Sequence, residues 1–224
     1  MRYPELIVMD LDGTLIDSAP DLGYAIEKML AALDKPAVSS RQVRDWIGNG
    51  MNMLVKRALT GKKNPEEHPE GFEHALQIFS DIYAQNISER GSLYPGVIEG
   101  LRQLQSDGFK LACLTNKHSK FTHRLLEKTG LSGFFDHIVC GDTYEQRKPH
   151  PLPLLKTAER FNVDPARSVM VGDSINDISA AKAAGFRAVC VPYGYMGDYT
   201  VDELAADHVV DSLAELPALF APAT

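Results

Sequence analysis

Short apolar runs alternate with amphipathic stretches along most of the chain, and this alternation predicts the fold. The first run, Leu6-Ile7-Val8-Met9, has the continuous hydrophobicity of a strand covered on both faces. Later runs predict strands at 111–114, 138–140, 169–171 and 188–191, an edge strand at 209–210, and helices at 96–107, 119–129, 152–162 and 176–184. Strands that alternate with helices are typical of a parallel sheet with helices on both faces.

Residues 18–88 show a different pattern, because their apolar positions repeat only with the period of a helix. Asp17 or Ser18 is expected to cap the first of these helices. Gly48-Asn49-Gly50 breaks the chain between two others. The predicted fold class is therefore α/β: a Rossmann-like doubly wound parallel sheet core, residues 1–17 and 90–224, with an inserted all-helical domain, residues 18–89.

Composition narrows the class of protein. The chain has 224 residues, enough for one sizeable core and a small second domain, with 44% hydrophobic and 24% charged residues. A net charge of −7 argues against nucleic acid as a partner, and no apolar run approaches the length of a membrane span. Three widely spaced cysteines without metal-ligand spacing favour a reducing cytoplasm. We expect a cytoplasmic monomer or small homo-oligomer without nucleic-acid or membrane partners.

Polar residues that suit phosphate chemistry stand where the predicted strands end. They are Asp10 and Asp12 after the first strand, Thr115-Asn116-Lys117 after the second, Lys148-Pro149 after the third, and Gly172-Asp173-Ser174-Ile175-Asn176-Asp177 after the fourth. Each alone could be an ordinary turn. In a parallel sheet they share one rim, where converging carboxylates require a hard cation such as Mg²⁺. Lysine and threonine suit phosphate oxygens, so a small phosphorylated substrate is expected.

In order and spacing, these motifs resemble those of the haloacid dehalogenase superfamily, and the helical insert resembles its mobile cap. The resemblance implies that Asp10 attacks phosphorus to form an aspartyl-phosphate and that Asp12 acts as general acid and then base. It implies that Thr115 and Lys148 hold the phosphoryl group. It also implies a Mg²⁺ site made by Asp10, the backbone carbonyl of Asp12 and Asp173, with Asp177 in support, and cap hinges near 18–19 and 89–94.

Within that superfamily, three stretches resemble bacterial phosphoglycolate phosphatases: 43–50, 56–59 and Tyr193-Gly194-Tyr195. This implies 2-phosphoglycolate as the substrate, whose carboxylate needs hydrogen-bond donors or a cation from the cap. The candidate substrate-binding residues are Asn116, Gly48, Asn49, Gly50 and Arg44, with Lys56 and Arg57 as further cations.

Simpler interpretations remain open. For each of these basic residues the simpler one is a solvated helix face, and His118 and His123 lie too far around a helix to share a metal. Another small phosphate ester, pyrophosphate or a sugar-phosphate mutase reaction are the alternatives. A non-catalytic phosphate-binding protein is disfavoured by the intact motifs.

Overall fold

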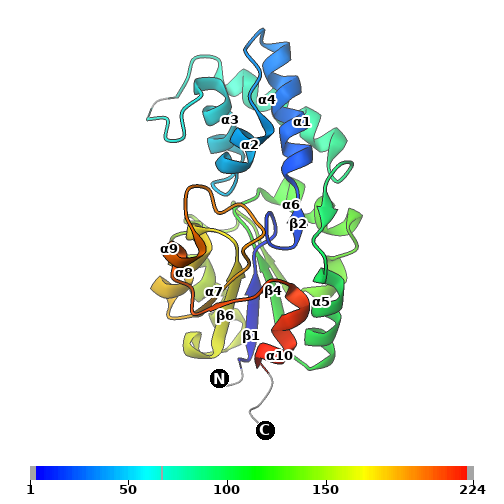
Figure 1. Cartoon of the computed structure of the whole chain (residues 1–224), viewed down its shortest axis with the longest axis vertical. Coiled ribbons are helices and arrows are strands. Elements are labelled where there is room, and N and C mark those ends of the chain that lie inside the picture. The colour runs from blue at the N-terminus through cyan, green and yellow to red at the C-terminus, as the bar shows by residue number, and fades with distance from the viewer. Residues whose placement is uncertain (1–3, 67, 221–224) are drawn as a thin grey trace.

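The computed structural model describes residues 4–66 and 68–220, and a six-stranded sheet lies at its centre (Figure 1). The strand order is β5-β4-β1-β6-β7-β8, and every neighbouring pair is parallel. These strands are β1 (Leu6–Met9), β4 (Lys110–Leu114), β5 (His137–Val139), β6 (Ser168–Gly172), β7 (Arg187–Cys190) and β8 (His208–Val209). The chain therefore winds outward from β1 in one direction and then in the other, as a doubly wound sheet does.

Alternate residues of the buried strands feed two apolar clusters, one on each face of the sheet. Leu6 and Val8 of β1 face one cluster, and Ile7 and Met9 face the other. Helices α7 (Leu152–Phe161) and α8 (Ile175–Ala184) cover the first face. Helices α5 (Val97–Ser106), α6 (Ser119–Lys128) and α10 (Leu216–Phe220) cover the second. Helices on both faces explain why the strands are apolar without interruption.

Four helices stand beyond the carboxyl ends of the strands, in the upper half of Figure 1. They are α1 (Ala19–Ala32), α2 (Ser40–Trp46), α3 (Met51–Thr60) and α4 (Phe72–Asn86). Their apolar faces pack on one another and join the cluster on the second face of the sheet. A short helix, α9 (Val201–Leu204), follows the last central strand.

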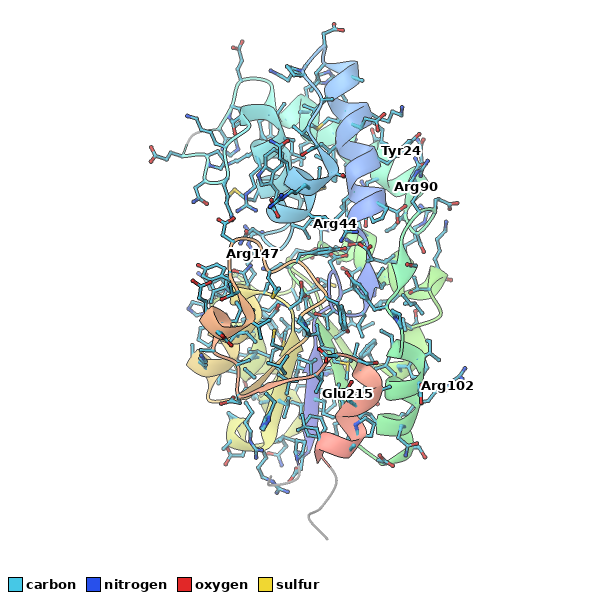
Figure 2. All side chains as sticks on the ribbon, in the orientation of Figure 1. Tyr24, Arg44, Arg90, Arg102, Arg147 and Glu215 are labelled. Atoms are coloured by element: carbon cyan, nitrogen blue, oxygen red, sulfur yellow. The ribbon has the colours of Figure 1, made fainter. Side chains whose placement is uncertain are left out.

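Two crossings connect these four helices to the sheet. Strands β2 (Ile16–Asp17) and β3 (Ser92–Leu93) pair antiparallel there. Beside them the buried carboxylate of Asp21, in the first turn of α1, accepts hydrogen bonds of 2.8–3.2 Å from the backbone N–H groups of residues 88–91. Next to this contact, the guanidinium of Arg90 lies 3.6 Å from the ring centroid of Tyr24 (Figure 2). The Asp21 side chain thus joins the start of α1 to the segment that follows α4.

The α/β sheet with helices on both faces is confirmed, and differences from the expected elements are local. The β2–β3 pair was not expected, because two-residue strands carry no periodicity. Ser18 does begin α1, but the expected side-chain cap is wrong, since its hydroxyl donates 2.6 Å to Asp12 Oδ1 instead. Within the described ranges, no helix combines the length and the apolar character that crossing a bilayer requires.

Candidate active site

Three neighbouring strands of the sheet end on polar residues. Asp10 follows β1, Thr115 follows β4, and Asp173 follows β6, while Asp177 lies in the first turn of α8. The strand order reverses between these strands, and ligands of doubly wound sheets bind at that point. The topology therefore gathers at one rim the residues expected for catalysis and metal binding.

Lys148 is buried between two of these carboxylates. Its Nζ lies 2.8 Å from Asp10 Oδ1 and 2.7 Å from Asp177 Oδ1, and it donates a 2.7 Å hydrogen bond to the carbonyl of Leu114. Burial alone would lower the pKa of Lys148, but the charges of Asp10 and Asp177 outweigh it and raise this pKa above its usual value. The ammonium group therefore stays charged at the centre of the acidic cluster.

The carboxyl groups of Asp10 and Asp173 are costly to ionise. Burial raises the pKa of Asp10 to about 7; Lys148 opposes this shift and Asp177 adds to it. Burial, together with the charges of Asp177 and Asp10, raises the pKa of Asp173 well above its usual range. The Thr14 hydroxyl (2.7 Å) and the Tyr195 backbone N–H (2.5 Å) donate to the two oxygens of Asp173. A group that neutralises these carboxylates would be bound tightly here.

A metal ion fits this charge arrangement. Among the described residues, Asp10, Asp173 and Asp177 each offer a carboxylate oxygen, and these oxygens lie within 4.8 Å of one another. The second oxygen of Asp177 accepts hydrogen bonds from the N–H (3.0 Å) and the hydroxyl (2.6 Å) of Ser174, which fixes the orientation of that carboxylate. Oxygen-only donors of this kind suit a hard divalent cation. Lys148 alone cannot neutralise three carboxylates.

Asp12 faces away from that group. Its carboxylate accepts the Ser18 hydroxyl and lies 2.8 and 2.9 Å from Lys117 Nζ. The Asp12 side chain is 12% exposed and lines a cavity between the rim of the sheet and the four helices. The two aspartates of the first motif therefore have different partners: Asp10 pairs with Lys148 inside the acidic cluster, and Asp12 pairs with Lys117 outside it.

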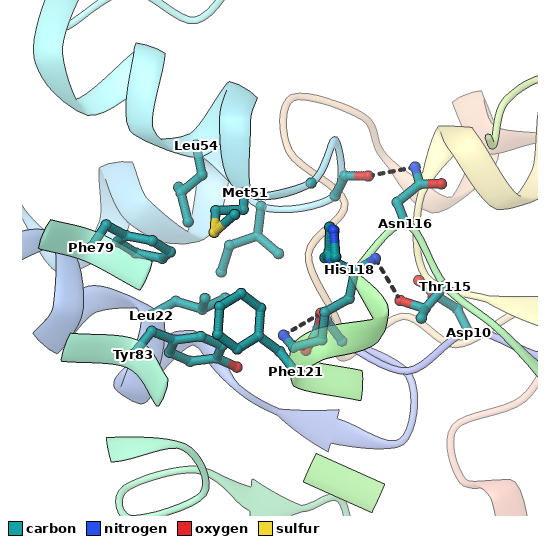
Figure 3. A pocket seen from close by; sticks show the side chains of 15 residues that line it. Asp10, Leu22, Met51, Leu54, Phe79, Tyr83, Thr115, Asn116, His118 and Phe121 are labelled. Atoms are coloured by element: carbon teal, nitrogen blue, oxygen red, sulfur yellow. Dashed lines mark hydrogen bonds and ion pairs between the residues drawn. The ribbon is translucent and has the colours of Figure 1, made fainter. Parts of the chain in front are cut away.

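The cavity beside Asp10 and Asp12 is small, with a volume of about 50 Å³. Figure 3 shows Asp10, Thr115, Asn116 and His118 on its sheet side and apolar side chains from the helices opposite. Those apolar residues are Leu22, Ile47, Met51, Leu54 and Phe79, together with Tyr83 of α4 and Phe121 of α6. A volume of this size holds only a few water molecules, so it selects a small ligand.

The loop between α2 and α3 closes part of this cavity. The Asn116 side-chain amide donates 2.9 Å hydrogen bonds to the carbonyls of Gly48 and Lys148, and Asn176 donates a 3.2 Å bond to Gly48. At Gly50, φ is +81°, and an added Cβ would lie 3.0 Å from a guanidinium nitrogen of Arg147 and 3.1 Å from the carbonyl of Asn116. The glycines therefore let the loop approach the sheet closely.

Comparison with known proteins agrees with this geometry. Residues 7–191 match the family model of haloacid dehalogenase-like hydrolases. The chain belongs to this family. The hydrolase is 42% identical over 223 residues to a phosphoglycolate phosphatase of Nitrosococcus oceani, which covers 100% of this chain and 99% of that protein. It is 46% identical over 209 residues to a phosphoglycolate phosphatase of Thiobacillus denitrificans, covering 93% and 92% of the two chains.

A solved structure agrees as well. The crystal structure of a predicted phosphoglycolate phosphatase from Haemophilus somnus superposes on the hydrolase with a TM-score of 0.92 at 33% identity, covering 99% of this chain and 100% of that one. The whole architecture of the hydrolase, including α1–α4, is therefore shared with that protein.

The cap cations expected to contact substrate are engaged elsewhere. Arg44 pairs with Asp17 at 2.7 Å, at the base of α1 (Figure 2). Arg57 donates to the backbone carbonyls of residues 46 and 63 and, at 2.9 Å, to Asn49 Oδ1, so it holds the α2–α3 loop in shape. Lys56 Nζ lies 5.5 Å from the ring centroid of Phe72. None of these described basic side chains lines the cavity.

Tyr195 connects the acidic cluster of the hydrolase to the start of α1. Its backbone N–H donates to Asp173, and its hydroxyl donates 2.7 Å to Asp17 and accepts 2.9 Å from the N–H of Ala19. A side chain at the neighbouring Gly194 would collide with Asp173. Residues 194 and 195 thus pack directly against Asp173 and fix its position. The sequence alone did not indicate this contact.

Two further residues line the cavity of the hydrolase: sequence reasoning placed Lys117 at the rim without giving it a role, and it missed Tyr83. Lys117 directly follows Thr115 and Asn116 at the end of β4, so its place in that motif was an available signal. Tyr83 lies in an ordinary apolar stripe of α4, where nothing separates a residue of the cavity wall from a core residue.

Proposed function

We propose that this hydrolase is a Mg²⁺-dependent phosphomonoesterase that converts 2-phosphoglycolate to glycolate and phosphate. One observation carries the chemistry: Lys148 bridges Asp10 and Asp177 while Asp12 stands apart, facing the small cavity. The substrate is supported by relatives named phosphoglycolate phosphatase that match nearly the whole chain.

In the first half of the proposed reaction, an oxygen of Asp10 forms a bond to phosphorus as the bond to the ester oxygen breaks. Asp12 gives its proton to that leaving oxygen, so that the alcohol departs neutral. In the second half, water attacks the aspartyl-phosphate, Asp12 accepts the proton of the water, and the Asp10 carboxylate is released with phosphate. Asp12 lines the cavity, which would place it beside the leaving oxygen.

Groups held in fixed positions would offset the negative charge of the phosphoryl group and of Asp10. Lys148 and the Thr115 hydroxyl would hold oxygens of the phosphoryl group. Mg²⁺ held by Asp10, Asp173 and Asp177, and by the backbone carbonyl of Asp12, would supply the positive charge that lets a carboxylate meet a phosphate dianion. The raised pKa values of Asp10 and Asp173 in the metal-free protein support the need for that cation.

We further propose that residues 18–89 form a cap that opens and closes over the core, residues 1–17 and 90–224. The contacts of Asn116 and Asn176 with the Gly48 carbonyl then describe the closed state, with hinges at 18–19 and 89–94. Gly48 and Gly50 line the cavity and would offer backbone N–H groups to the substrate, whereas the Asn49 side chain is bound by Arg57. Closure would exclude water from the intermediate.

A cytoplasmic location is proposed on the three buried free cysteines, which suit a reducing compartment. The partners proposed are the small phosphorylated substrate and Mg²⁺, and the proposed state is a monomer or small homo-oligomer.

The test is release of inorganic phosphate from a panel of small esters, with 2-phosphoglycolate and pyrophosphate included, in Mg²⁺ and in chelator. We expect kcat/KM for 2-phosphoglycolate to exceed the others by orders of magnitude, chelator to abolish turnover, and Asp10→Asn to be inactive. Equal rates on all esters would defeat the substrate claim, and an active Asp10→Asn variant would defeat the covalent mechanism. Rapid phosphate release also argues against a mutase.

A further inference from the structure

The proposed substrate brings a second anion into the cavity, and that anion needs a partner. A carboxylate removed from water is costly unless it is paired with a cation or several hydrogen-bond donors. The helix side of the cavity offers mainly apolar side chains, such as Leu22, Met51, Leu54 and Phe79. The question is which group receives the carboxylate of the substrate.

The cap does not supply the cation in this closed arrangement. Arg44 is held by Asp17, Arg57 by the backbone of the α2–α3 loop, and Lys56 lies over Phe72. Of the described residues that line the cavity, Lys117 is the one lysine or arginine.

His118 also lines the cavity, but both of its ring nitrogens are already engaged. Nδ1 accepts a 3.2 Å hydrogen bond from the N–H of Lys120, at the start of α6. Nε2 lies 3.3 Å from a carboxylate oxygen of Asp142. A substrate carboxylate would have to displace one of these contacts, whereas the Lys117 ammonium has three N–H donors and the two oxygens of Asp12 accept two of them.

Lys117 has the position that such a substrate requires. Its Nζ is bound to the carboxylate of Asp12, the group proposed to protonate the ester oxygen. It therefore lies one hydrogen bond beyond Asp12, and the carboxylate carbon of 2-phosphoglycolate lies two bonds beyond the ester oxygen that Asp12 would contact. The Lys117 side chain is only 6% exposed, and burial alone would lower its pKa, but Asp12 raises that pKa above its usual value.

Tyr83 supplies a second, independent observation. Its ring centroid lies 5.0 Å from Lys117 Nζ, and its side chain forms part of the cavity wall (Figure 3). The hydroxyl oxygen is buried and forms no well-aligned hydrogen bond with a described residue, although it interacts with the nearby ammonium group of Lys117. A buried hydroxyl without a well-aligned partner is rare in native proteins and is explained when a ligand completes it.

We propose that Lys117 of the core, rather than a cap arginine or lysine, binds the carboxylate of the substrate, and that the Tyr83 hydroxyl from α4 donates a second hydrogen bond to it. This inference rests on the proposed function, because it assumes a phosphate ester with a nearby carboxylate. The cap would then contribute to selectivity by bringing Tyr83 and apolar side chains close to Lys117. A substrate without a carboxylate would make no ion pair with Lys117 and would therefore bind less well. Lys117 is thereby a specificity-determining residue.

The test compares 2-phosphoglycolate with the phosphate ester of glycolamide, which has nearly the same shape but no carboxylate charge. In Lys117→Met we expect the ratio of their kcat/KM values to fall by roughly 10–100-fold, the scale of a lost charge-assisted contact. Using the ratio cancels any effect that the loss of the Asp12 partner has on both substrates. Lys117→Arg should restore much of the ratio, and Tyr83→Phe should lower it by about 3–10-fold, as the loss of one hydrogen bond predicts.

Lys156→Met is the matched control, because Lys156 lies on α7, outside the cavity, and pairs with the nearby Glu159. The ratio for this variant should equal that of the wild type. A ratio unchanged in Lys117→Met would overturn the inference. If Lys117→Met does not fold, an unchanged ratio of the two kcat/KM values in Tyr83→Phe would overturn the proposal that Lys117 and Tyr83 bind the carboxylate together. A wild-type enzyme that does not prefer 2-phosphoglycolate over other esters would instead refute the proposed function, so the two failures are distinguishable.

Discussion

The contact made by Asp21 leads to a quantitative prediction about the connection between the cap and the core. The carboxylate is 1% exposed and accepts four backbone hydrogen bonds from residues 88–91, where the chain returns from α4 to the sheet. Of these four N–H groups in the described structure, that of Glu89 also donates a 3.3 Å hydrogen bond to the carbonyl of Asn86, at the end of α4. Removing the carboxylate therefore acts where the chain returns from α4 to the sheet rather than in an apolar core.

We expect Asp21→Ala to lower the free energy of unfolding by about 2–4 kcal/mol. A buried donor left without a partner costs about 1–3 kcal/mol, and because residues 88–91 are partly exposed, water will satisfy some of the four. For a chain of this size the loss corresponds to a fall in Tm of roughly 5–15 °C. Asp21→Asn should be nearly as harmful, because its NH₂ group would face two of the donors.

Gly91→Ala tests the same contact from the other side. An added Cβ would lie 2.7 Å from the carbonyl of Asp17 and 2.8 Å from Asp21 Oδ2, so it would push the carboxylate away. We therefore expect this variant to be destabilised as well. Thermal and urea unfolding should be compared with Asp81→Ala, which removes an exposed carboxylate of α4 bound only to Gln77 in the described contacts. If Asp21→Ala is no less stable than Asp81→Ala, the assigned role is wrong.

Two further predictions concern the acidic groups of the site. Asp12→Asn should reduce turnover of an alkyl phosphate by about 10²–10⁴-fold but reduce turnover of p-nitrophenyl phosphate far less, since only the alkoxide needs a proton; equal losses would reject Asp12 as the acid. In chelator, the wild-type Tm should fall as pH rises from about 4 through 7, because burial raises the folded pKa of Asp10 to about 7 and only the folded chain keeps that proton. Mg²⁺ should diminish this slope, and so should Asp10→Asn in chelator; a slope identical in that variant would show that Asp10 is not its source.

The sequence was most informative where one residue type meets one physical requirement. Runs such as Leu6–Met9 must be covered on both faces, and the structure buries all four of these residues. The parallel sheet followed from these patterns, and the family followed from the resemblance of the polar motifs at the strand ends. Asp10 and Asp173 share one rim because their strands are parallel, which the alternation of elements implied, and the strand order seen in the structure makes those strands neighbours.

The partners of long polar side chains could not be predicted. Arg44 and Arg57 have the same chemistry as a ligand-binding arginine, but one binds Asp17 and the other binds backbone carbonyls. Which partner a guanidinium takes depends on distances set by the packing of α1–α3. For the same reason Asp21, an ordinary first-turn aspartate in the sequence, gave no sign of its four backbone contacts.

The central place of β1 has a consequence for the order of events during synthesis. The strand is made first, but its neighbours β4 and β6 begin only at Lys110 and Ser168. The nascent chain must therefore carry an apolar strand with two open edges while α1–α4, whose contacts are local, have already been made. We expect β1 to remain cleavable by protease in ribosome-bound chains halted before β6. Early protection of β1 in such chains would contradict this order.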